Sequence, residues 1–130
     1  MPPAPIPPEI EAFLRKANPA VVATIRSDGS PHSVATWYDL VDGRILLNLA
    51  TTRARLAHIK RDPRVSLTVL DVDDWYTHVT LTGVIEQLVD DPELADIDRR
   101  ALRYQGHRFR NREAPRVSAW MRCERWYRWD

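Results

Sequence analysis

Residues 44–64 read RILLNLATTRARLAHIKRDPR, and this stretch decides the fold. Its first part, Arg44 to Leu49, is apolar at almost every position, which is typical of a strand buried on both faces inside a small barrel. The threonine pair Thr51-Thr52 is suited to cap a helix over about Arg53 to Arg61, and Asp62-Pro63 ends that helix. The pattern therefore predicts a buried strand followed directly by a short helix.

Other runs of β-branched and apolar residues predict further strands of the same sheet. The predicted strands span residues 20–26, 32–41, 44–49, 64–70 and 75–88, with a last one from about Val117. Turn residues at Asp28-Gly29 and Asp42-Gly43 join neighbouring strands as antiparallel pairs, and Gly83 predicts a bulge in the longest strand. We expect a mainly β protein with peripheral helices, built as a six-stranded antiparallel split β-barrel of Greek-key type.

Two more helices flank these strands. One is expected from Pro8, with Ile10, Phe13 and Leu14 at helical spacing. The other is expected from Asp90 to about Tyr104, and its predicted inward residues are Leu94, Ile97, Ala101 and Leu102. The proline-rich residues 1–8 cannot form a helix or a central strand, so we predict an extended arm followed by a single domain over 9–130.

Length and composition narrow the class of protein. With 130 residues the chain suits one domain, and its single cysteine excludes a disulfide framework. No apolar run approaches the roughly twenty residues of a membrane span, and the N-terminus does not resemble a signal peptide. The four histidines lack metal-ligand spacing, so no metal site is predicted. We expect a cytoplasmic protein with no membrane span.

The net charge is close to zero, but acidic and basic residues are unevenly distributed along the chain. Residues 71–98 hold seven Asp, two Glu and no cation, whereas residues 99–128 hold ten Arg and two Glu. Seventeen of the nineteen basic residues are arginines. Arginine suits phosphate and carboxylate recognition because its guanidinium is a planar fork, although a GC-rich genome is an alternative origin of the bias.

Arg53 and Arg55 stand where the predicted helix begins. Free N–H groups and the positive end of the helix dipole favour anions there, so cations are out of place unless an anion binds between them and the backbone. The two side chains converge only if Arg53 lies at or before the cap. The alternative is that both are solvated surface residues. We interpret the pair as a site for a phosphate or a carboxylate.

These segments together resemble the flavin- and deazaflavin-dependent oxidoreductases of the pyridoxamine-phosphate-oxidase-like, FMN-binding split barrel. Within that superfamily the chain is most similar to the actinobacterial branch assigned to coenzyme F420. The resemblance covers most of the chain beyond the arm. It is carried by Ala23–His32, Trp37-Tyr38, Arg44–Leu47, Thr51–Arg55, Asp62–Val65, Trp75–Val79, Gly83, Tyr104–Gly106 and Glu124–Trp126.

The resemblance implies a homodimer that binds coenzyme F420, or alternatively FMN, at the subunit interface. It assigns the phosphate to Thr51, Thr52, Arg53 and Arg55, and the acidic polyglutamyl tail to Lys60. It places the ring against His32, Val34, Ala35, Thr36 and Trp37, with Trp75, Tyr76 and His78 approaching from the partner. Many relatives carry Lys where Arg55 stands. The excess of arginine favours the deazaflavin, because its polyglutamyl tail needs more cationic contacts than the short phosphate tail of FMN.

The implied activity is hydride transfer from the reduced deazaflavin to a small conjugated organic acceptor of the quinone, enone or tetrapyrrole type. The protein then orients the reactants and excludes water. Candidate proton donors are His32, Tyr38 and His78. Alternatives are an FMN-dependent oxidoreductase and a non-catalytic protein that stores the coenzyme.

The arginines and tryptophans of the C-terminal segment also suit single-stranded nucleic acid, but the balanced overall charge argues against that partner. We favour a dimer interface, where Trp, Tyr and Arg are enriched. Strand alternation predicts that Trp120, Arg122, Glu124 and Trp126 share one face.

Overall fold

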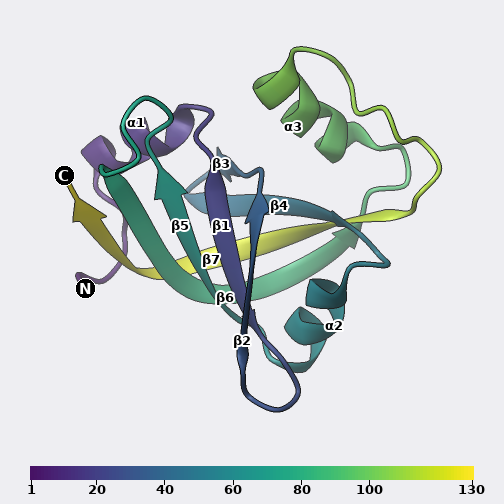
Figure 1. Ribbon diagram of the computed structural model, residues 1–130, viewed down its shortest axis with the longest axis horizontal. Coiled ribbons are helices and arrows are strands. Elements are labelled where there is room, and N and C mark those ends of the chain that lie inside the picture. Colours follow the sequence, from purple (N-terminus) through teal and green to yellow (C-terminus); the bar gives the residue numbers. More distant parts are fainter.

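Seven antiparallel strands form one strongly curved sheet in the computed structural model, which describes residues 1–130 (Figure 1). The strands are β1 (Ala20–Ile25), β2 (Pro31–Thr36), β3 (Asp39–Val41), β4 (Arg44–Ala50), β5 (Arg64–Leu70), β6 (His78–Asp90) and β7 (Arg116–Trp129). The helices are α1 (Pro8–Arg15), α2 (Ala54–Arg61) and α3 (Ala95–Gln105). None of the three is long and apolar enough to cross a membrane.

The strand order β2-β1-β5-β6-β7-β4-β3 places β2 and β3 at opposite edges of the sheet. Only Trp37 and Tyr38 connect these two strands. Since consecutive Cα atoms are 3.8 Å apart, the two edges approach within about 11 Å at this connection. The sheet is therefore curled into a split barrel, as predicted.

The count of six strands was wrong, because residues 32–41 do not form one strand. The chain leaves the sheet at Trp37-Tyr38 and re-enters it at the other edge. The Tyr38 ring lies fully buried in the core at this crossing. Local alternation of polar and apolar residues does not reveal such a change of edge.

Two predicted starts also differ from the structure. Strand β6 begins at His78, because Trp75–Thr77 belong to the turn after β5. Helix α3 begins at Ala95, because β6 continues to Asp90 and the buried Asp91 carboxylate accepts hydrogen bonds from the backbone of Asp96 (3.2 Å) and Ile97 (3.0 Å).

The predicted inward face of α3 is confirmed except at Leu102. Leu94, Ile97 and Ala101 are buried, whereas Leu102 is exposed. The buried residues follow the spacing i, i+3, i+7 of one helix face, and Leu102 lies beside that face.

The predicted bulge at Gly83 is confirmed. Thr82 pairs with Arg125 and Gly83 pairs with Cys123, which leaves Glu124 as the extra residue of β7. The bulge reverses the alternation beyond it, so Trp126 packs against the core instead of sharing the face of Trp120, and that prediction was wrong.

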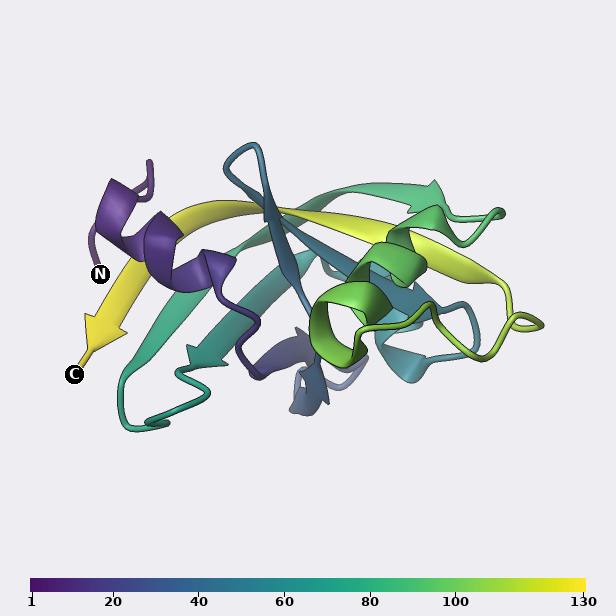
Figure 2. The ribbon, with the colours of Figure 1, turned by 90° about the horizontal axis from the view of Figure 1, so that it is seen from above.

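Helices α1 and α2 pack against one apolar core. Helix α1 buries Ile10 and Leu14, and α2 buries Leu56 and Ile59. Helix α3 stands apart from α1 in both views (Figure 1 and Figure 2). The N-terminal arm lies along β7, where the backbone of Ala4 donates to Glu124 O at 2.9 Å.

Candidate functional site

A cleft of about 580 Å³ lies where α3, the end of β2 and the start of α2 face one another. It is the larger of the two main hollows on the chain. It is lined by Ala17, Pro19, Ala20, Ala35, Thr36, Trp37, Asn48, Arg53, Arg55, Val72, Ile97, Arg100, Tyr104, Phe109 and Arg116. Its size is in the range of small-molecule sites.

Four arginines line this cleft and no carboxylate does. Arg53 is the N-cap residue of α2, so it lies at the cap as convergence with Arg55 requires. The threonine pair does not cap the helix, and that prediction was wrong: the Thr51 backbone N–H instead donates to Pro115 O at 3.0 Å, in the segment before β7. The first turn of α2 contains no acidic residue.

The third cation, Arg116, comes from β7. Its Nε donates to Asn48 Oδ1 at 2.7 Å, and its guanidinium lies 4.6 Å from the centre of the Phe109 ring. Burial lowers the pKa of Arg116, and the charges of Arg53 and Arg55 lower it further, while the charge of Asp91 acts in the opposite direction. Burial and then Arg53 lower the pKa of Arg55 in the same way. The three cations therefore repel one another across the cleft.

Aromatic side chains form a second wall. The rings of Trp37 and Tyr104 stack with centroids 5.4 Å apart and planes 8° from parallel. Phe109 packs edge-on against Trp37, with centroids 6.2 Å apart. The Tyr104 hydroxyl donates to Asn18 O at 2.7 Å, which fixes its ring. A planar conjugated ligand has an apolar surface here beside a cationic one.

The structure brings together five of the residues that the sequence singled out: Ala35, Thr36, Trp37, Arg53 and Arg55 line the cleft. Thr51 and Thr52 are exposed beside it. Lys60 lies in a separate groove of about 320 Å³ between α2 and β6. Val34 is half-buried and packs against the core.

None of the three candidate proton donors lines the cleft of its own chain. His32 lies beside α2, with Nδ1 3.0 Å from Arg26 Nη2 and its ring edge-on to His58. The Tyr38 hydroxyl is engaged in the core, 2.8 Å from Leu14 O, and burial raises its pKa. His78 Nδ1 lies 2.8 Å from Tyr76 O, at the start of β6.

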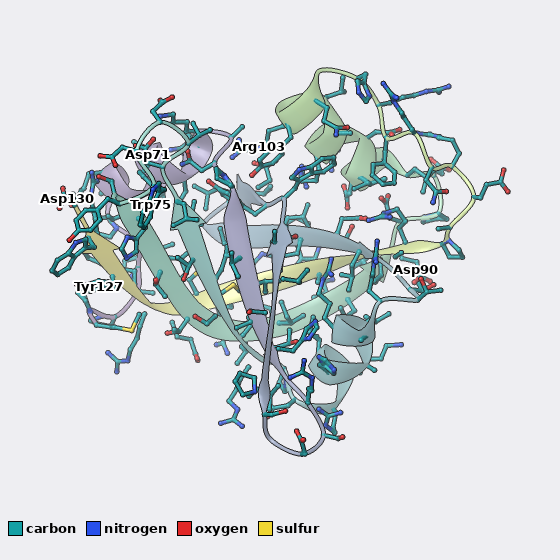
Figure 3. The ribbon with its side chains drawn as sticks, in the orientation of Figure 1. Asp71, Trp75, Asp90, Arg103, Tyr127 and Asp130 are labelled. Atoms are coloured by element: carbon teal, nitrogen blue, oxygen red, sulfur yellow. The ribbon has the colours of Figure 1, made fainter.

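Trp75 and Tyr76 belong to an exposed cluster that we call the aromatic patch: Trp75, Tyr76, Tyr127 and Trp129. Neighbouring rings in it have centroids between 6.2 and 6.4 Å apart. Figure 3 places Trp75 and Tyr127 at the end of the molecule that holds Asp130, away from α3. The patch is thus a surface separate from the cleft within one chain.

The sequence did not single out Asn48, Arg100, Tyr104, Phe109 and Arg116 as cleft residues. Except for Asn48, which stands three residues before Thr51, they lie far from the Thr51–Arg55 segment in sequence and form no local motif. The excess of arginine in residues 99–128 was a signal for Arg100 and Arg116 alone, because the other three residues are not arginines.

Comparison with known proteins identifies the family. Residues 6–130 match the family described as Pyridoxamine 5'-phosphate oxidase. The match covers nearly the whole chain, so this chain belongs to the pyridoxamine-phosphate-oxidase-like split-barrel family.

Solved structures agree with this placement. The structure of an F420 reductase is 27% identical to this chain with a TM-score of 0.85, and the alignment covers 94% of this chain and 98% of that one. A conserved hypothetical protein from Mycobacterium tuberculosis is 28% identical with a TM-score of 0.75, covering 98% and 86%. A heme binding protein from Mycobacterium smegmatis, at 22% identity and a TM-score of 0.65, shares the fold and covers 95% and 55%.

Proposed function

We propose that this chain is an oxidoreductase that binds a phosphorylated deazaflavin, coenzyme F420, in the cleft and transfers a hydride to a small conjugated organic acceptor. The observation that carries the proposal is the set Arg53, Arg55 and Arg116. These guanidiniums share one cleft and repel one another, and none of them is in a salt bridge within the chain. A bound phosphate would relieve that repulsion.

The residues present fit such a coenzyme. Arg53 and Arg55 at the start of α2, with the Thr51 and Thr52 hydroxyls beside them, suit a phosphate, and the free N–H groups of the first helical turn add to its binding. Ala35, Thr36 and Trp37 line the same cleft and would contact the ring. The likeness to an F420 reductase favours the deazaflavin over FMN, which remains the alternative coenzyme of the same fold.

When bound, the reduced coenzyme supplies the hydride itself. The residues of this chain then have three tasks: to bind the phosphate, to orient the ring and the acceptor against each other, and to exclude water. Trp37, Tyr104 and Phe109 would exclude water along the apolar wall. The cationic wall fixes the end of the coenzyme from which the ring extends.

A second candidate function is storage or transport of the coenzyme without catalysis. It is favoured by the absence of His, Cys, Lys, Asp and Glu among the residues that line the cleft. Tyr104 has the one titratable hydroxyl there, and that hydroxyl already donates to Asn18 O. In a storage protein the same cationic wall holds the coenzyme, but no acceptor substrate binds beside it.

We also propose that the site is completed by a second copy of the chain. Trp75, Tyr76 and His78 would then approach the ring from the partner, and Lys60 would contact the polyglutamyl tail outside the cleft. His32 and His78 remain the candidate proton donors, while the buried Tyr38 is better explained as part of the core.

The test is a paired titration with coenzyme F420 and FMN, read by fluorescence. We expect micromolar or tighter binding of the deazaflavin and its loss in the double variant Arg53→Glu/Arg55→Glu. The double variant Arg15→Glu/Arg64→Glu makes the same change in charge at exposed positions outside the cleft, and we expect it to bind normally. Binding of FMN alone would overturn the choice of coenzyme.

An activity assay separates the enzyme from the carrier. The reduced coenzyme is mixed with the chain and with a quinone, an enone or a tetrapyrrole, and its oxidation is followed by absorbance. If coenzyme binds but none of the acceptors is reduced, storage is the better reading.

A further inference from the structure

The guanidinium of Arg116 is engaged on one side and free on the other. Its Nε donates to Asn48 Oδ1 at 2.7 Å, whereas its terminal nitrogens Nη1 and Nη2 have no hydrogen-bond partner in the chain and both reach solvent. The Nη1–Nη2 edge of a guanidinium carries two parallel N–H groups, so it can bind an anion by two prongs while Nε is engaged. Because Arg116 lines the cleft, this accessible edge is available to a ligand there.

The pairing of β4 with β7 brings Asn48 to Arg116. Asn48 pairs with Ser118, and Ala50 pairs with Arg116. Directly paired residues of neighbouring strands share a face of the sheet, and so do residues two apart along one strand. The Asn48 side chain therefore lies on the same face as those of Ser118 and Arg116, within reach of both.

Two acceptors fix the orientation of the Asn48 amide. Its Nδ2 donates to Asp91 Oδ2 and to Ser118 Oγ, each at 3.1 Å. The Ser118 hydroxyl donates to Asp96 Oδ2 at 2.5 Å, so its oxygen can only accept from Asn48. Asn48, Asp91 and Ser118 are all buried. Both N–H groups of the amide are thus in use, and Oδ1 is left to face Arg116 Nε.

Asn48 holds Arg116 without neutralising it. Arg112, in the loop before β7, is held by a carboxylate instead, with its Nη1 2.5 Å from Asp98 Oδ1. An amide oxygen accepts the same kind of hydrogen bond but carries no formal charge. Asp91 lies on the Nδ2 side of Asn48 and forms no salt bridge with Arg116. The charge of Arg116 is therefore left for an anion in the cleft.

We propose that Asn48 is a positioning residue of the anion site: it fixes the guanidinium of Arg116 through Nε and leaves Nη1, Nη2 and the positive charge to the phosphate of the bound coenzyme. Asn48 itself does not touch the phosphate. The inference rests on the proposed function for the identity of the ligand, whereas the position and charge of Arg116 do not depend on it. A carboxylate at position 48 would form a salt bridge with Arg116 and compete with the phosphate.

The first test follows the Nε–Hε signal of Arg116 by NMR in the wild-type chain, with inorganic phosphate as the probe. The signal is identified by its loss in Arg116→Lys. We expect this proton to exchange with solvent more slowly than those of exposed arginines before phosphate is added, and to stay protected when phosphate binds, because Asn48 engages Nε in both states. Fast exchange of the Arg116 proton without phosphate overturns the proposal.

Two variants separate the charge at position 48 from the contact. Asn48→Asp keeps an acceptor for Nε but adds a negative charge, and it should weaken phosphate binding about tenfold. Asn48→Ser is too short to reach Nε, so it should weaken phosphate binding about threefold and speed the exchange of the Arg116 proton. The control is Asn18→Ser at the other buried asparagine, which should lose stability but bind phosphate normally.

An Asn48 that served only the stability of the fold would leave phosphate affinity equal in the wild type and in both folded variants, and that result overturns the proposal. Coenzyme F420 is titrated in parallel. If phosphate responds as expected but the coenzyme does not bind, the proposed function fails while the role of Asn48 stands. If the coenzyme binds with the same affinity in all three proteins, Asn48 does not position the site.

Discussion

At Gly83 the backbone of β7 comes close to that of β6. A Cβ added there would lie 2.0 Å from the carbonyl oxygen of Arg122 and 3.1 Å from Cys123 Cα. Both neighbours are backbone atoms of the paired strand, so no side-chain rotation relieves the clash. We expect Gly83→Ala to lower the free energy of unfolding by about 3 kcal/mol, measured by urea denaturation.

Gly43 is a control for Gly83. It separates the cost of the close strand contact from the cost of a left-handed backbone conformation. It has a φ of +77° and nothing within 4 Å of an added Cβ. Gly43→Ala should therefore cost only about 1 kcal/mol, from the left-handed backbone alone. Equal losses in the two variants would show that strand contact does not explain the glycine at position 83.

At the scale of single residues, half of the cationic wall could be predicted from the sequence. Arg53 and Arg55 are recognisable because they stand together where a helix begins. Arg100 and Arg116 are not, because each reaches the cleft from a different element and lies among many other arginines. Only the packing of α3 and β7 around the cleft distinguishes them from their solvated neighbours.

At the scale of elements, α1 is held in place by groups from distant parts of the chain. Arg103 of α3 donates to the carbonyl oxygens of Arg15 (2.7 Å), Leu14 (3.1 Å) and Lys16 (2.7 Å), at the C-terminal end of α1. The Tyr38 hydroxyl shares the oxygen of Leu14. Figure 3 shows Arg103 between the two helices. These contacts supply the last carbonyls of α1 with donors that the helix itself lacks.

We expect Arg103→Met to keep the apolar stem of the side chain and to lose these donations. The free energy of unfolding should fall by about 2 kcal/mol, because charge-assisted hydrogen bonds to several carbonyls are lost together. Amide hydrogen exchange should accelerate in α1 more than in the central strands. The exposed neighbour Arg99 serves as the control, and Arg99→Met should leave amide exchange in α1 unchanged. If Arg103→Met also leaves exchange in α1 unchanged, Arg103 does not hold α1 in place.

The same scale shows why some element boundaries could be predicted and others could not. Strands bounded by Asp-Gly or Asp-Pro pairs were placed within a residue or two, because their turn chemistry is local. The break at Trp37-Tyr38 was missed, since burial of Tyr38 and the change of sheet edge depend on the whole barrel. The late start of α3 was missed because the acidic residues before it suggested a helix start, while Asp91 acts from a buried position outside the helix.

At the scale of the whole molecule, the aromatic patch and the cleft are two separate surfaces. Trp75 is 71% exposed and Trp129 is 45% exposed. Both chain termini lie at the same end of the molecule (Figure 1). Adjoining exposed aromatic rings are typical of surfaces that bind a partner, because tryptophan and tyrosine are enriched at interfaces. The cleft, by contrast, contains none of the patch residues. In the proposed dimer, each copy covers the aromatic patch of its partner and brings its own patch toward the partner's cleft.

We therefore expect the chain to be a dimer in light scattering at micromolar concentration, and the double variant Trp75→Ser/Trp129→Ser to be a monomer. Because we propose that the partner completes the coenzyme site, the same variant should bind coenzyme F420 about tenfold more weakly. Leu102→Ser removes an exposed apolar side chain from α3 instead, and it should leave the molar mass unchanged. A wild-type monomer that binds the coenzyme with full affinity would contradict the shared site, whereas a variant that stays dimeric would place the interface on another surface.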